Sequence, residues 1–318
     1  MKLFAIIRTG IIASLLAIVV GCAPKSEPVG NIYRFEGVEP AVYYTAVSPL
    51  NEGFDGETVA IVIQGWHGGV KVHKGYIAMQ STLKDAYVVS PMFPRAESMQ
   101  RNGVEFDGRA IWNNSWPLDL TIPGTADDDW RGGGDAEGTE LSSYEIIDLL
   151  LAKLSDKTLF PNLRKVALIG FSAGGQFVGR YVAVGKGEVA PHIEMRYVAL
   201  APSTFLIPEP NDSWHYGLKG RPRYSRNISE EQIMENLRSR RCLHGCGLLD
   251  TLEKDLDMTP LAMKQGRNRY VRFENFKELV SKDPRWSEVT TFHTFEDIGH
   301  QAQKAYEDPF FVEYVMGK

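Results

Sequence analysis

A serine with the surroundings of a nucleophile lies near the middle of the sequence, in Gly170-Phe171-Ser172-Ala173-Gly174. The apolar run 165–171 predicts a buried strand, and the residues after the serine suit a helix. Between a strand and a helix, the two glycines allow a sharp turn that leaves the serine hydroxyl exposed. The start of the helix adds unpaired N–H groups where an oxyanion would form. The pattern therefore predicts that Ser172 attacks a carbonyl carbon.

Such a serine needs a base, and the base needs an orienting acid. Where this kind of turn carries the nucleophile, the acid and then the histidine follow it along the chain. His300 comes directly after the last predicted strand and is the predicted base, with His293, inside that strand, as the weaker alternative. Asp250 closes the preceding predicted strand and is the predicted acid. Asp255 and Asp257 lie slightly later and are the alternatives.

An oxyanion needs two N–H donors aimed at the developing charge. Ala173, which follows the nucleophile, is expected to supply one of them. The other is expected from the turn Gln64-Gly65-Trp66-His67-Gly68-Gly69, which follows a second apolar strand. Trp66 is the predicted donor, with His67 as the alternative. Gln64 stands where such turns often have a histidine, so the hydrogen bonds behind this turn are expected to differ.

The elements that must position these residues follow an alternating pattern. Apolar, β-branched runs alternate with amphipathic segments, which predicts βα units and a mostly parallel sheet. Strands are expected at 58–64, 86–90, 165–171, 194–201, 241–249 and 288–295. Helices are expected at 142–155, 173–184, 230–238, 273–280 and 301–307.

Two long segments, 91–138 and 202–228, interrupt this alternation and are rich in tryptophan, glycine and proline. Both follow predicted strands, so we expect them to form the walls and lid of a pocket. The alternative is that their tryptophans, Trp112, Trp116 and Trp130 among them, only hold the loops against the core. The acidic run 127–129 could bind Ca²⁺, but a solvated loop is expected there. No metal or cofactor is expected.

Length and composition favour one ordinary globular domain. The chain has 318 residues, of which 43% are hydrophobic and 24% charged, so a sizeable core can form. The formal net charge is −5, and no basic block is long enough to indicate a nucleic-acid partner. The sequence contains no internal repeat and no low-complexity linker, and it leaves the oligomeric state open.

The N-terminal residues indicate export and lipid attachment. Lys2 and Arg8 precede an apolar stretch, and Val19-Val20-Gly21-Cys22 resembles a bacterial lipoprotein cleavage box. We therefore expect residues 1–21 to be a signal peptide, Cys22 to be lipidated, 22–40 to be a tether, and 41–318 to be one catalytic domain. An uncleaved signal anchor is the alternative. The expected location is the bacterial cell envelope, with the protein anchored to a membrane through Cys22.

Two further cysteines, Cys242 and Cys246, are separated by three residues. Outside the cytoplasm a disulfide between them is expected, with reduced thiols as the alternative. His244 lies between them, but no further ligand nearby completes a tetrahedral metal site.

The chain resembles the serine-dependent α/β-hydrolases, and more narrowly a group of secreted microbial α/β-hydrolase-like proteins of poorly defined substrate. The resemblance spans about residues 55–305. It is carried by the segments 141–148, 160–163, 172–176, 180–181, 214–218, 262–266 and 299–300. It implies the α/β-hydrolase fold, with a mostly parallel central sheet, flanking helices and loop or lid insertions. It also implies a Ser172, His300, Asp250 triad. Phe171 replaces a histidine often found before the nucleophile, and the strand with Cys242 and Cys246 is unusual.

These residues together predict a serine hydrolase of the carboxylesterase type, with an acyl-enzyme intermediate. Its substrate is expected to be a small-molecule ester, or an ester on a glycan or lipid. A peptidase or lactonase on the same fold is an alternative. A second class is a surface-tethered binding lipoprotein on a catalytically retired scaffold, because fold alone does not define function. A binding protein would have no reason to keep a complete site, which favours the enzyme.

Overall fold

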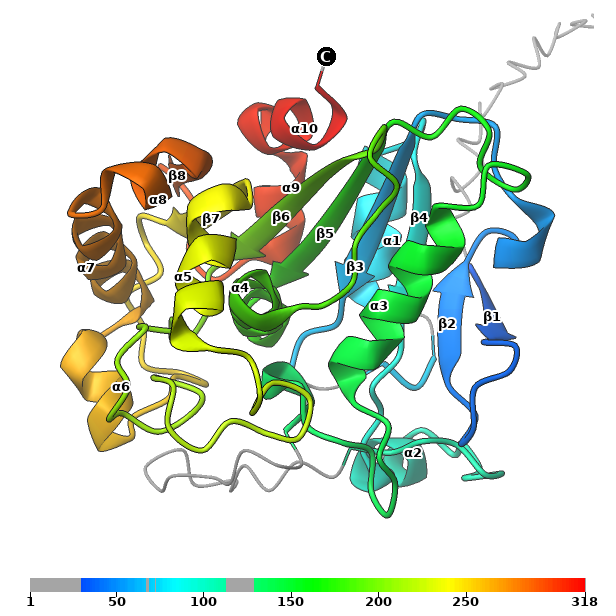
Figure 1. The fold of residues 1–318 in the computed structure, drawn as a ribbon, viewed down its shortest axis with the longest axis horizontal. Coiled ribbons are helices and arrows are strands. Elements are labelled where there is room, and N and C mark those ends of the chain that lie inside the picture. Colours follow the sequence, from blue (N-terminus) through cyan, green and yellow to red (C-terminus); the bar gives the residue numbers. More distant parts are fainter. Residues whose placement is uncertain (1–29, 67–68, 72, 113–128, 318) are drawn as a thin grey trace, which may run out of the picture.

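The computed structural model describes residues 30–66, 69–71, 73–112 and 129–317. Its centre is an eight-stranded sheet of order β1-β2-β4-β3-β5-β6-β7-β8 (Figure 1). The strands are β1 Asn31–Arg34, β2 Tyr43–Ala46, β3 Thr58–Ile63, β4 Tyr87–Pro91, β5 Lys165–Phe171, β6 Glu194–Leu200, β7 Cys242–Gly247 and β8 Thr290–Phe295. The six strands from β4 to β8 are parallel, whereas β1 and β2 pair antiparallel at one edge. The predicted mostly parallel sheet is therefore confirmed.

Helices cover both faces of this sheet (Figure 1). They are α1 Lys74–Thr82, α2 Ala96–Arg101, α3 Ser143–Leu154, α4 Ala173–Val184, α5 Glu230–Ser239, α6 Pro260–Gln265, α7 Arg269–Ser281, α8 Pro284–Val289, α9 Ala302–Glu307 and α10 Pro309–Met316. Helices α3, α4, α5, α7 and α8 contribute to the core on one face, and α1, α9 and α10 to the core on the other. Along β3, Val59 and Ile61 point into the first core and Ala60 into the second, so the whole strand is buried.

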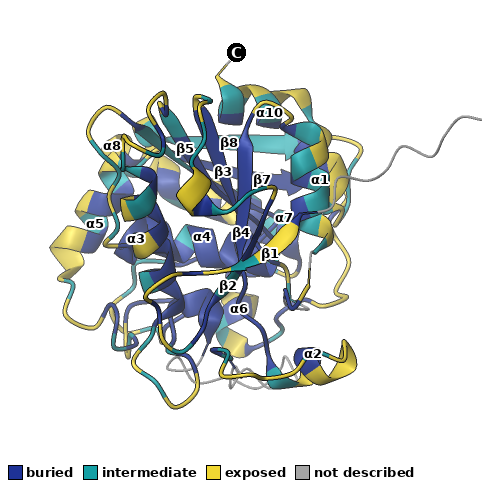
Figure 2. Cartoon of the chain, turned by 90° about the vertical axis from the view of Figure 1, so that its right-hand side faces the viewer, coloured by how far each residue is buried: buried dark blue, intermediate teal, exposed yellow. Residues whose placement is uncertain are grey.

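The start of the folded domain differs from the prediction. Residues 31–34, expected to belong to the tether 22–40, form β1 and pair with residues 43–46 of β2. The folded domain therefore begins before residue 41. Strand β1 is short and mostly exposed (Figure 2), so its sequence carries no alternating apolar pattern that would reveal it. The expected strand 288–295 is also shorter, because 284–289 forms α8.

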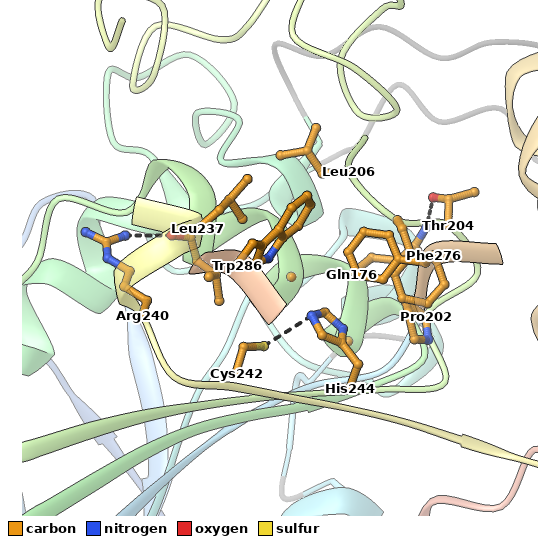
Figure 3. Close-up of a pocket in the computed structure, with 14 residues that line it drawn as sticks. Gln176, Pro202, Thr204, Leu206, Leu237, Arg240, Cys242, His244, Phe276 and Trp286 are labelled. Atoms are coloured by element: carbon orange, nitrogen blue, oxygen red, sulfur yellow. Dashed lines mark hydrogen bonds between the residues drawn. The ribbon is translucent and has the colours of Figure 1, made fainter. Parts of the chain in front are cut away.

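The expected disulfide between Cys242 and Cys246 is wrong. Both thiols are free and buried. They lie four residues apart along β7, and a strand rises about 3.3 Å per residue, so their Cα atoms are too far apart for a disulfide. Cys242 Sγ instead lies 3.3 Å from His244 Nε2, beside a small hollow of about 10 Å³ (Figure 3). Burial lowers the pKa of His244 to about 3, so its imidazole is neutral at pH 7.

The long segments 91–138 and 202–228 follow β4 and β6. Trp112 and Trp130 are fully buried and belong to the main core, so they pack the first segment down and do not line a pocket. Trp116, Asp127 and Asp128 lie outside the described residues. Asp129 is fully buried, so the expected solvated loop is wrong at that position. The described residues contain no cluster of metal-binding side chains, and none of their helices has the length and apolarity to cross a bilayer.

Candidate active site

The serine of the Gly-x-Ser-x-Gly motif occupies a strained turn between β5 and α4. Ser172 has φ +59° and ψ −116°, a backbone conformation that residues other than glycine rarely adopt. Its N–H donates to Leu200 O on β6 at 2.8 Å, which ties the turn to the sheet. The side chain is partly exposed at the carboxyl end of β5. Such strain persists only where the surrounding structure holds it in place. The neighbouring glycines contribute because they let the turn pack closely against the sheet.

Helix α4 begins in close contact with the ends of β3 and β6. A Cβ atom at Gly174 would lie 2.6 Å from Ile63 O and 2.8 Å from Gln64 O. A Cβ at Gly175 would lie 2.4 Å from Leu200 O. Carbonyl groups of a buried sheet cannot move away cheaply, so only glycine allows this approach. The glycines after Ser172 thus bring the helix start, with its free N–H groups, up to the sheet edge.

This contact leads to a stability prediction. Gly174→Ala should lower the free energy of unfolding by about 2 kcal/mol or more, because its Cβ meets two backbone oxygens. Gly179→Ala, on the same helix, is the matched control. Its Cβ would meet nothing closer than 3.9 Å, so it should be neutral or stabilise the protein by up to about 1 kcal/mol. Urea denaturation of both variants measures the difference, and equal stabilities would contradict this account.

The structure brings the three predicted catalytic side chains together. His300 Nε2 lies 2.9 Å from Ser172 Oγ, and His300 Nδ1 lies 2.7 Å from Asp250 Oδ2. Asp250 is 1% exposed, whereas the His300 side chain is 31% exposed. The three residues follow β5, β7 and β8, at the edge where the carboxyl ends of parallel strands meet. A hydroxyl, an imidazole and a buried carboxylate therefore form one continuous chain of hydrogen bonds.

The alternative residues lie elsewhere. His293, inside β8, places Nε2 3.3 Å from Asp308 Oδ1 and stacks on the Phe310 ring. Asp257 is buried and accepts a hydrogen bond from the Tyr216 hydroxyl at 2.9 Å. Asp255 is exposed and has a positive φ of 54°. The structure gives neither aspartate a contact with His300.

Of the two predicted oxyanion donors, Trp66 precedes Ser172 in the chain and Ala173 directly follows it. Ala173 is the first residue of α4, where an N–H group has no partner within the helix. Trp66 follows β3, while His67 lies outside the described residues. Behind Trp66 the buried Gln64 accepts from Gly69 N at 2.6 Å and donates to Phe93 O at 2.7 Å. A glutamine at this position therefore joins the turn after β3 to the segment after β4.

A buried charged cluster beside Trp66 was not foreseen from the sequence. The guanidinium carbons of Arg131 and Arg95 lie 4.7 and 5.0 Å from the centre of the indole ring. Arg131 makes a two-pronged ion pair with Asp129 at 2.9 and 2.7 Å, and His215 Nε2 lies 3.3 Å from the same carboxylate. Burial alone would raise the pKa of Asp129, but the Arg131 guanidinium holds it at about 2.

This cluster connects the two parts of the candidate oxyanion site. Arg131 Nη1 donates to Gln176 Oε1 at 3.4 Å, and Gln176 lies one turn along α4 from Ala173. The same arginine therefore contacts the Trp66 ring and the helix that follows Ser172. Arg95 and Arg131 lie in the Gly- and Asp-rich segment 91–138, where an exposed arginine would be expected. No signal in the sequence indicates that these two are buried.

The fold of this chain is similar to the folds of two solved structures. The poly(3-hydroxybutyrate) depolymerase LpqC from Bordetella parapertussis superposes with a TM-score of 0.64 and 17% identity, over 91% of each chain. Poly(aspartic acid) hydrolase-1 from Sphingomonas sp. KT-1 gives a TM-score of 0.65 and 18% identity, over 91% of this chain and 99% of its own. No protein-family model and no curated protein sequence matches the chain. The chain thus has the α/β-hydrolase fold expected from its sequence.

Proposed function

We propose that this protein is a serine hydrolase that cleaves carboxylic esters through an acyl-enzyme intermediate. The observation that carries the proposal is the hydrogen-bonded chain from Ser172 Oγ through His300 to the buried Asp250. Chance packing rarely joins a strained, exposed serine to an imidazole whose other nitrogen is held by a carboxylate. Nucleophilic catalysis by serine requires this combination of a hydroxyl, a base and an orienting acid.

In the proposed first step, Ser172 Oγ attacks the ester carbonyl carbon while His300 Nε2 takes the hydroxyl proton. The carbonyl oxygen becomes an oxyanion, and the backbone N–H groups of Ala173 and Trp66 stabilise it. The tetrahedral intermediate then loses its alcohol, which receives the proton from His300. The acyl group is left bound to Ser172.

In the second step, water attacks the acyl-enzyme and gives its proton to His300 Nε2. Collapse of the new oxyanion releases the carboxylic acid and returns the proton to Ser172 Oγ. Throughout, Asp250 holds Nδ1–H of His300, which leaves Nε2 free to face the serine. No step requires a metal or a cofactor.

Two arguments support an ester as the substrate, one from leaving-group chemistry and one from the shared fold. An oxygen leaving group departs more readily than an amine, so an ester demands least of a serine and its base. The fold is shared with a polyester depolymerase as well as with a poly(aspartic acid) hydrolase, so amide and lactone cleavage are outcomes that a substrate panel must separate.

The test is to treat the purified, folded protein with a fluorophosphonate and locate the adduct by peptide mass spectrometry. We expect a single adduct on Ser172. A panel of short- and long-chain p-nitrophenyl esters, lactones and peptide amides then defines the bond cleaved. Absence of an adduct on folded protein would overturn the proposal and favour a binding protein on a retired hydrolase scaffold.

We also propose that the chain is anchored to a bacterial membrane through a lipid on Cys22. The support is the Gly21-Cys22 box after an apolar stretch. Strand β1 begins at Asn31, nine residues later, so the folded domain would lie close to the membrane surface.

The anchor leads to its own prediction. In a bacterial host with lipoprotein-processing enzymes, the wild-type chain should enter the detergent phase on Triton X-114 partition and carry a metabolically supplied fatty acid. Cys22→Ala should carry no fatty-acid label, because it lacks the acceptor thiol. Equal fatty-acid labelling of both proteins would show that Cys22 is not the point of attachment.

A further inference from the structure

A buried arginine lies behind the proposed catalytic acid. Arg269, the first residue of α7, places Nη1 3.6 Å from Asp250 Oδ1. This is the carboxylate oxygen that His300 does not contact, since His300 Nδ1 faces Oδ2. Both Arg269 and Asp250 are 1% exposed. Within the described part of the chain, Arg269 and His300 are the two basic groups within 4.0 Å of this carboxylate.

The guanidinium of Arg269 is held in place by backbone groups. Its Nη2 donates to Asp255 O at 2.6 Å, and its Nη1 donates to Lys254 O at 3.3 Å. The next residue, Tyr270, donates its N–H to Asp250 O at 3.2 Å. The start of α7 therefore contacts both the backbone of the loop after β7 and the side chain of Asp250, the proposed acid in that loop.

A buried carboxylate needs a compensating charge, and Arg269 is the guanidinium beside the Asp250 carboxylate. Burial lowers the pKa of the Arg269 guanidinium, and the Asp250 carboxylate opposes that shift, so the arginine keeps its charge. We propose that Arg269 is a positioning residue that compensates the Asp250 charge and directs Oδ2 towards His300. This inference rests on the proposed hydrolase function.

A merely structural arginine would only fasten the loop at Lys254 and Asp255. A double-mutant cycle separates the two roles, because a residue that acts through another has no effect once that other is removed. Arg269→Met keeps most of the side-chain volume but removes the charge. It should lower kcat for a p-nitrophenyl ester by about tenfold or more with KM nearly unchanged. Arg269→Lys keeps a charge without the planar fork and should retain more of the activity.

In the Asp250→Asn background, Arg269→Met should change kcat by less than about twofold. Arg272→Met is the matched control. Arg272 is a fully buried arginine on the same helix, donates to the backbone oxygens Gly266 O, Ser203 O and Asp257 O, and forms no ion pair with Asp250. Its effect on kcat should be the same with and without Asp250.

Equal effects of Arg269→Met in both backgrounds would overturn the inference and leave Arg269 a structural role. If Arg269→Met does not fold, the same cycle with Arg269→Lys decides, since a positioning role predicts a loss of kcat that vanishes with Asp250→Asn. If Asp250→Asn alone leaves kcat and fluorophosphonate labelling unchanged, the proposed triad fails as well. The failure of the function and the failure of the inference are therefore distinguishable.

Discussion

Ser172→Ala should lower kcat for ester hydrolysis by roughly 10⁴-fold or more and abolish fluorophosphonate labelling. Removing Oγ removes the atom that would form the acyl-enzyme, and no neighbouring side chain can take its place at the strained turn. The Ala173 and Trp66 N–H groups would still bind an oxyanion, so a small residual rate over water is expected. Steady-state assays and gel-based labelling measure both effects.

The serine variant also tests whether loss of activity reflects loss of structure. Alanine lacks the hydroxyl but keeps a Cβ, so the backbone strain at φ +59° stays, and the thermal midpoint should change little. An unchanged ester turnover in a folded Ser172→Ala protein would place the nucleophile elsewhere. If Ser172→Ala unfolds, Ser172→Gly is the comparison, because glycine also lacks the hydroxyl and adopts a positive φ without strain.

His300→Gln should slow both turnover and labelling by about 10³-fold or more, because Ser172 would lose the base that accepts its proton. Glutamine can still donate a hydrogen bond near Ser172 Oγ, but it cannot take up a proton at neutral pH. The effect should fall on kcat, since the rest of the binding surface is retained. The measurement is the rate of fluorophosphonate labelling beside steady-state hydrolysis.

The matched control is His293→Gln. His293 lies seven residues earlier on β8, faces Asp308 and Phe310, and makes no contact with Ser172. Its replacement should leave kcat within a few-fold of the wild-type value. A large loss at His293 with normal activity at His300 would contradict the assignment of the base.

Much of the architecture could be predicted because its signals are local. Strand β5 is nearly all apolar, and β3 is buried along its whole length, so both appear as continuous hydrophobic runs. The turn at Ser172 shows in its two glycines. The order serine, aspartate, histidine along the chain predicts Asp250 and His300. In the structure His300 lies within hydrogen-bond distance of both Asp250 and Ser172.

The features that were missed depend on tertiary surroundings. Strand β1 exists because it pairs with β2, and its four mostly exposed residues carry no periodic signal. The disulfide between Cys242 and Cys246 was inferred from the cellular compartment, but the extended geometry of β7 excludes it. The sequence gives no sign that Arg131 and Arg269 are buried with a carboxylate partner, because the burial of each ion pair arises only in the folded structure.

The contact between Ser172 and His300 joins positions 128 residues apart, and His300 follows β8, the strand at one edge of the sheet. Closing a loop of this length carries a large entropic cost, so we expect β8 and His300 to join the sheet after the strands around Ser172 have paired. A chain that has paired its other strands but not yet added β8 would have a formed core around Trp112 and Trp130 and no base beside its serine. After dilution from denaturant, tryptophan fluorescence should therefore recover before hydrolysis does, and the lag between them measures how fast the last strand docks.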